Sequence, residues 1–177
     1  PISAQRGYVE RIVSSTAEQM GFEDMPHRGE ISTDDIVCLF DSEGIKKFYF
    51  VVNFPQASSF YRIDTTFMSR FYDTRRFARE KITYVSTKTL DSFIESEKIG
   101  YVDFLKVDVE GCEYNVIGGA KKTLQNSILG LTLEVEFSHI FNGGVLFAEI
   151  DQILRSWNFK LFDIGVGRFS RKSVSGD

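Results

Sequence analysis

Four carboxylates occur as two pairs, each with i, i+2 spacing inside a strand-like run. They are Asp108 and Glu110 in residues 102–113, and Glu134 and Glu136 in residues 131–137. On a strand, side chains two residues apart point to the same face, roughly 7 Å apart. Two such pairs on neighbouring strands would gather four acids in one place, which folding does not favour. The pattern therefore indicates a functional site that accepts a proton, stabilises a cation or holds a divalent ion.

Alternating strand-like and helix-like segments in the second half of the chain predict βαβ units with parallel strands. We expect strands at 102–109, 131–137 and 160–164, and helices at 90–97, 113–126 and 147–157. Ligands bind outside the carboxyl ends of such strands, where Asp108, Glu110 and Glu136 fall. The 131–137 strand follows a crossover and should be interior, so its carboxylates would need a partner or a cation.

The first half of the chain has a less regular pattern. We expect a helix at 9–20, a loop at 22–35, strands at 36–40, 48–52 and 82–85, and no clear assignment for 65–80. The tail from Arg168 should be frayed or antiparallel. Together these segments predict a single domain over 1–177, with helix and loop in 1–35, a core in 36–165 and a tail in 166–177.

Composition limits the classes of function. The chain has 177 residues, enough for one domain with a real core, and a formal net charge of −4, which argues against a nucleic-acid surface. No apolar run reaches the length of a membrane span, and the N-terminus has no secretory pattern. Cys38 and Cys112 lack metal-ligand spacing, so we expect a reduced pair in a cytoplasmic protein. Nothing in the sequence identifies the oligomeric state.

Several candidate residues have a plainer interpretation. Glu110 and Glu113 could simply favour the N-terminus of the following helix through its dipole, and Lys106 could neutralise Asp108. His139 could be a structural histidine or a catalytic base. Ser59 follows a second serine in a loop, which is common, although such a pair could bind phosphate or another ligand.

The core motif is Lys-Val-Asp-Val-Glu-Gly-Cys-Glu at 106–113, preceded by Thr-Leu-Asp-Ser-Phe at 89–93 and followed by Leu-Glu-Val-Glu-Phe at 133–137. With weaker matches between 36 and 164, the chain resembles the FkbM-type family of S-adenosylmethionine-dependent methyltransferases. The resemblance implies an α/β, Rossmann-like class I methyltransferase sheet, mostly parallel with helices on both faces. It also implies O-methylation of a hydroxyl on a saccharide or secondary metabolite.

The resemblance assigns roles to particular residues. The catalytic candidates are Asp108, Glu110, Glu134, Glu136 and His139. The candidates for binding S-adenosylmethionine are Phe40, Asp41, Ser59 and Asp108. A divalent metal is a possible second cofactor, and the expected partner is a small-molecule or saccharide acceptor, with neither nucleic acid nor membrane.

One family feature is absent from the sequence. No Gly-x-Gly loop follows a strand-like run in the first half, so we expect that the first two strands and their cofactor loop are missing from this chain. Two alternatives stay open. One is a divalent-metal-dependent phosphoryl-transfer enzyme, since paired acids on adjacent strands can hold two ions. The other is a non-catalytic fragment with the same fold.

Overall fold

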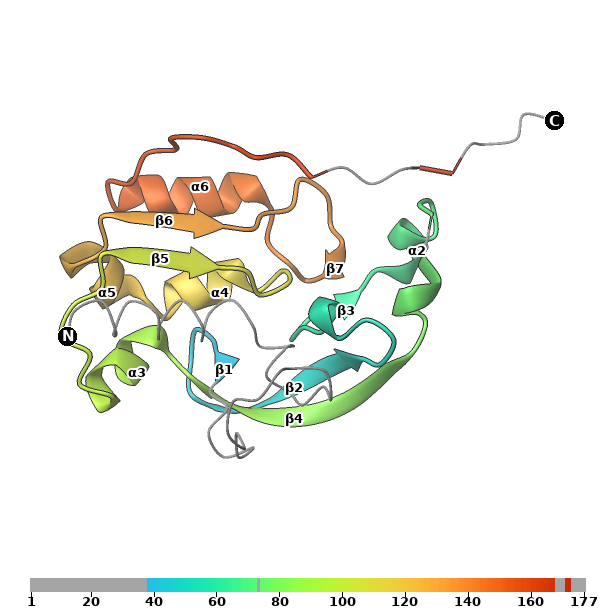
Figure 1. Ribbon diagram of the computed structural model, residues 1–177, viewed down its shortest axis with the longest axis horizontal. Coiled ribbons are helices and arrows are strands. Elements are labelled where there is room, and N and C mark those ends of the chain that lie inside the picture. The colour runs from blue at the N-terminus through green and yellow to red at the C-terminus, as the bar shows by residue number, and fades with distance from the viewer. Residues whose placement is uncertain (1–37, 73, 168–170, 173–177) are drawn as a thin grey trace, which may run out of the picture.

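Three small sheets and five short α-helices make up the computed structural model, which describes residues 38–72, 74–167 and 171–172 (Figure 1). The strands are β1 (Cys38–Leu39), β2 (Gly44–Val51), β3 (Arg62–Ile63), β4 (Glu80–Lys88), β5 (Phe104–Val107), β6 (Gly130–Leu133) and β7 (Phe141–Asn142). The helices are α2 (Thr65–Met68), α3 (Leu90–Ser96), α4 (Glu113–Gly118), α5 (Lys121–Asn126) and α6 (Phe147–Ser156), with 3-10 turns η2 (Pro55–Ala57) and η3 (Thr74–Phe77). The expected helix at 9–20 and loop at 22–35 lie outside the described residues.

Strands β5 and β6 lie side by side and run parallel, which confirms the pairing expected from the crossover between them (Figure 1). Leu105 and Val107 point to one face and are at most 1% exposed, in one core cluster with residues of α4, α5 and α6. The opposite face carries exposed Phe104 and Thr132. The three helices therefore cover the apolar face and leave the other open.

The expected single, mostly parallel sheet is not what the described strands form. β1 pairs parallel with β4, but β2 pairs antiparallel with β4 over eight residue pairs, and β3 pairs antiparallel with β7. The Thr87 hydroxyl joins β4 to the start of β2 by donating to Ser42 O and Gly44 O. In the described structure β6 has β5 as its one neighbour, so β6 is an edge strand and not the interior strand expected.

The expected strand at 160–164 is wrong. This segment has no regular structure, and Phe162 is 101% exposed. Alternation of apolar residues is not sufficient for a strand, because the backbone groups also need a partner strand. The tail residues that the structure describes do pair antiparallel, since Arg171 bridges Phe71 and Lys172 N donates to Arg70 O.

The expected helix at 113–126 is divided into α4 and α5. Gly119 is the C-cap of α4, and a Cβ there would lie 2.2 Å from Phe40 O, so the helix end touches the chain after β1. The Asp91 carboxylate then accepts from Lys122 N and Thr123 N at 2.8 Å and caps α5. In the described part of the chain, no helix has the length and apolar character needed to span a membrane.

Candidate functional site

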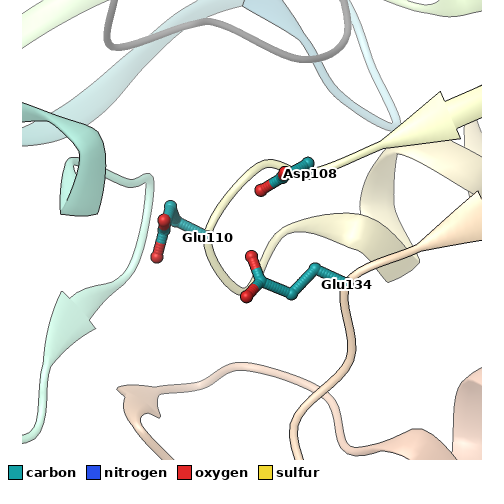
Figure 2. Close-up of side chains that lie close together, drawn as sticks. All are labelled: Asp108, Glu110 and Glu134. Atoms are coloured by element: carbon teal, nitrogen blue, oxygen red, sulfur yellow. The ribbon is translucent and has the colours of Figure 1, made fainter. Parts of the chain in front are cut away.

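Three carboxylates converge where β5 and β6 end. One oxygen from each of Asp108, Glu110 and Glu134 lies within 4.8 Å of the others (Figure 2). Asp108 and Glu134 are the first residues after their strands, whose last paired residues are Val107 and Leu133. Glu134 N continues the ladder by donating to Val107 O at 3.0 Å. The parallel pair thus places these acids at one edge, as the sequence predicted. We call Asp108, Glu110 and Glu134 the acid cluster.

Glu110 reaches the cluster by a turn and not by strand geometry. Because β5 ends at Val107, the expected i, i+2 alternation on a strand is wrong for this residue. Glu110 has a φ of +56° and Gly111 has a φ of +84°. A left-handed conformation is uncommon outside glycine and indicates that the surroundings enforce it.

Two contacts hold this turn. The Ser59 hydroxyl donates to Glu110 O at 2.7 Å and accepts from Tyr61 N at 3.0 Å. On the other side the turn packs against Phe141, because a Cβ on Gly111 would lie 2.6 Å from Phe141 Cδ2. The turn therefore has room only for a glycine at position 111.

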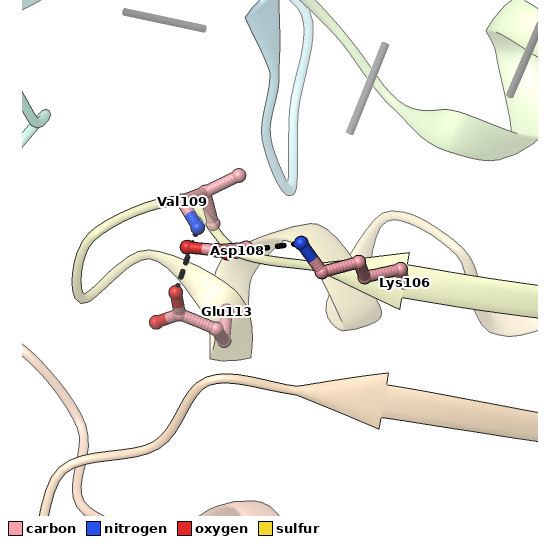
Figure 3. Close-up of polar contacts among 4 residues, drawn as sticks. All are labelled: Lys106, Asp108, Val109 and Glu113. Carbon is pink, nitrogen blue, oxygen red and sulfur yellow. Dashed lines mark hydrogen bonds and ion pairs between the residues drawn. The ribbon is translucent and has the colours of Figure 1, made fainter. Parts of the chain in front are cut away.

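Glu113 supports the cluster from the first turn of α4 (Figure 3). Its Oε1 accepts from Val109 N at 2.9 Å, while Oε2 is buried without a hydrogen-bond partner. Burial, followed by repulsion from Glu136, raises the pKa of Glu113 to about 8. The hydrogen bond to Val109 N gives Glu113 a structural role at the start of α4, while its raised pKa argues against the expected charge–dipole effect.

The acids outnumber the cations around them. Lys106 Nζ contacts Asp108 Oδ2 at 3.1 Å, as expected from their shared face (Figure 3). Burial and then repulsion from Glu134 and Asp108 raise the pKa of Glu110 to about 9. Burial and then Asp108 raise the pKa of Glu134 to about 7, against an opposing effect of Lys106. Near neutral pH, Glu110 is therefore protonated while Glu134 exchanges a proton readily.

Glu136 and His139 continue the chain beyond the cluster. Glu136 is half-buried, and its charge contributes to the raised pKa values of Glu110 and Glu113. His139 is exposed and lines a small hollow together with Glu136. The structure thus links Glu136 to the acid cluster electrostatically and puts His139 on the hollow beside it.

Phe40 and Asp41 occupy a separate position beside α4. The Phe40 ring packs against Phe60 at a centroid distance of 4.7 Å, and Lys46 Nζ lies 4.7 Å from the same centroid. The Asp41 carboxylate accepts from Asn115 Nδ2 at 2.6 Å. Their role in cofactor binding stays a prediction.

Tyr61 and Asn115 were not singled out from the sequence. The Tyr61 hydroxyl donates to Asn115 Oδ1 at 2.9 Å, and the same Asn115 side chain binds Asp41. These hydrogen bonds join residues more than 50 positions apart, so no local spacing could reveal them. They connect the end of β1 to the segment that carries Ser59.

Comparison with known proteins identifies one family. A family model described as the methyltransferase FkbM domain matches residues 31–161. No curated protein and no solved structure matches the chain.

Proposed function

This chain belongs to the FkbM methyltransferase family, and we propose that it transfers a methyl group from S-adenosylmethionine to a hydroxyl of a saccharide or secondary metabolite. One observation carries the proposal within this family. Asp108, Glu110 and Glu134 converge at the carboxyl ends of two parallel strands, where α/β sheets bind their ligands.

The acid cluster is suited to a cationic donor. Near neutral pH Glu110 and Glu113 are protonated, so the negative charge of the site comes from Asp108, which pairs with Lys106, and from ionised Glu134. Negative charge lowers the cost of bringing a sulfonium out of water. When bound, S-adenosylmethionine would supply an electrophilic methyl group to the acceptor oxygen and would leave as S-adenosylhomocysteine. We assign Asp108 to the contact with the sulfonium, with Phe40 and Asp41 as the further cofactor candidates.

Glu134 and Glu110 of the acid cluster would then have different roles toward the acceptor hydroxyl, one as base and one as hydrogen-bond donor. The acceptor hydroxyl loses its proton to the Glu134 carboxylate, whose basicity Asp108 increases. Protonated Glu110 can donate a hydrogen bond that orients the acceptor. Glu136 and His139 line the small hollow and stay catalytic candidates without an assigned step.

A divalent cation is the second candidate for this cluster. Three carboxylate oxygens within 4.8 Å of one another make a set that Mg²⁺ or Ca²⁺ would accept, either to assist methyl transfer or to support phosphoryl transfer. Arg75 and Arg76 belong to η3, a segment between α2 and β4 that lies apart from β5 and β6 (Figure 1). This favours the methyltransferase over the phosphoryl-transfer enzyme.

The full-length protein tests the proposal by two measurements. Transfer of label from [methyl-³H]S-adenosylmethionine to a panel of saccharides and hydroxylated metabolites should occur without added metal and persist in EDTA. Calorimetry should show binding of S-adenosylmethionine. Binding of Mg²⁺ without binding of the methyl donor would instead support the second candidate, and binding of neither would support a non-catalytic protein.

A further inference from the structure

We propose that Ser59 is a positioning residue, which holds the Glu110 carboxylate in the acid cluster by fixing the backbone of the turn at residues 110 and 111. The inference rests on the proposed function, in which Glu110 orients the acceptor. It differs from the expectation that Ser59 binds the cofactor directly.

The contacts of Ser59 are directed inward. Ser59 is 1% exposed. Its hydroxyl donates to Glu110 O and accepts from Tyr61 N. The Cys112 sulfur lies 3.4 Å from the same oxygen. A hydroxyl donates one hydrogen, and here that hydrogen is directed to Glu110 O.

Ser59 is itself held by the backbone. Its N donates to Tyr49 O at 3.1 Å, and Tyr49 N donates to Ser59 O at 2.8 Å, which ties it to β2. The Ser59 hydroxyl therefore connects β2 to the turn at Glu110, which lies 51 residues further along the chain.

The turn needs such a restraint. A non-glycine residue in the left-handed region is strained, so Glu110 would relax toward negative φ if its carbonyl were released. A change of φ at Glu110 rotates its side chain away from Asp108 and Glu134. A misplacement of about 1 Å at a reacting centre can cost about 100-fold in rate.

Ser58 provides a matched control. It is also buried, at 4% exposed, and its hydroxyl accepts from Val51 N at 3.0 Å instead of donating to the turn. Ser59→Ala and Ser58→Ala therefore each delete one buried, hydrogen-bonded hydroxyl from adjacent positions. Only the first deletion releases Glu110.

The kinetic test compares these variants in the full-length protein with S-adenosylmethionine as donor. Ser59→Ala should lower kcat between about 10-fold and 100-fold while KM for the donor changes less than about twofold. Ser58→Ala should keep kcat within about twofold of wild type. Equal kcat values for the two variants would overturn the proposal.

Hydrogen exchange supplies a readout that does not depend on methyl transfer. The peptide covering residues 109–112 should exchange faster in Ser59→Ala than in Ser58→Ala or wild type, and unchanged exchange would also overturn the proposal. Faster exchange in a protein whose wild type transfers no methyl would support the positioning of Glu110 and reject the proposed function. If Ser59→Ala does not fold, Ser59→Cys and Ser58→Cys under reducing conditions give the same comparison.

Discussion

Asp108 and Glu134 are the first residues after two neighbouring parallel strands, and their carboxylate oxygens come within 4.8 Å of each other. Two carboxylates at this separation cannot both ionise at their usual pKa values. Together with burial, the Asp108 charge raises the pKa of Glu134 to about 7. The strand pairing thus produces a carboxylate that can accept a proton near neutral pH.

The first prediction concerns the pH dependence of methyl transfer. Glu134 must be ionised to accept the acceptor's proton, so kcat should rise with pH through a midpoint near 7. Lys106 lowers the pKa of Glu134, so Lys106→Gln should move the midpoint to higher pH. Initial rates from about pH 5 to about pH 9 check both statements, with exposed Lys121→Gln as control. A midpoint that falls in Lys106→Gln would contradict the assignment of the base.

The second prediction concerns stability. The folded-state pKa of Glu113, about 8, is above the ordinary value of 4.5, so the folded protein binds an extra proton between these values. The cost of ionising the buried Glu113 carboxyl is therefore absent at low pH. It lowers the free energy of unfolding increasingly as the pH rises from 4.5 to about 8. Glu113→Gln keeps the acceptor for Val109 N and removes the charge. Its free energy of unfolding relative to wild type should increase by about 3 kcal/mol between about pH 5 and about pH 8.

Denaturant titrations at the two pH values make this measurement. Glu149→Gln, at an exposed position of α6, is the control and should show no such trend. A relative stability of Glu113→Gln that falls with pH would show that the carboxylate is held charged.

The third prediction concerns the turn itself. Gly111→Ala combines a φ of +84° with a Cβ 2.6 Å from Phe141 Cδ2, so it should destabilise the protein by more than about 2 kcal/mol. Gly118→Ala places its Cβ at an ordinary 3.8 Å from Asp41 Cβ and should be neutral or slightly stabilising. Thermal unfolding of the two variants provides the comparison. Similar melting temperatures would mean that the turn tolerates a side chain.

Sequence patterns predicted the parts of the site that depend on local structure. The crossover length predicted the parallel pairing of β5 and β6, and with it the meeting of Asp108 and Glu134. The expected helix at 90–97 is confirmed as α3, and its N-cap is Thr89, whose hydroxyl accepts from Ser92 N at 3.0 Å. These features follow from periodicity, capping and the geometry of parallel strands.

Other features depend on contacts that local patterns do not encode. The antiparallel pairing of β2 with β4 and the absence of a strand at 160–164 reflect which partner strands are available. The left-handed conformation of Glu110 depends on Ser59, which is distant in sequence. The sequence could therefore identify the acids but not the contacts that bring them together.

The most direct test of the central claim is the methyl-transfer rate of Asp108→Asn in the full-length protein, with Asp163→Asn at an exposed position as control. The Asp108→Asn substitution keeps the size of the side chain and removes the charge that faces Glu134 and that the proposed function places near the sulfonium. We expect kcat to fall about 100-fold or more in Asp108→Asn, with an unchanged melting temperature, and to stay at the wild-type value in Asp163→Asn. Wild-type turnover by Asp108→Asn would contradict the claim that methyl transfer takes place at the acid cluster.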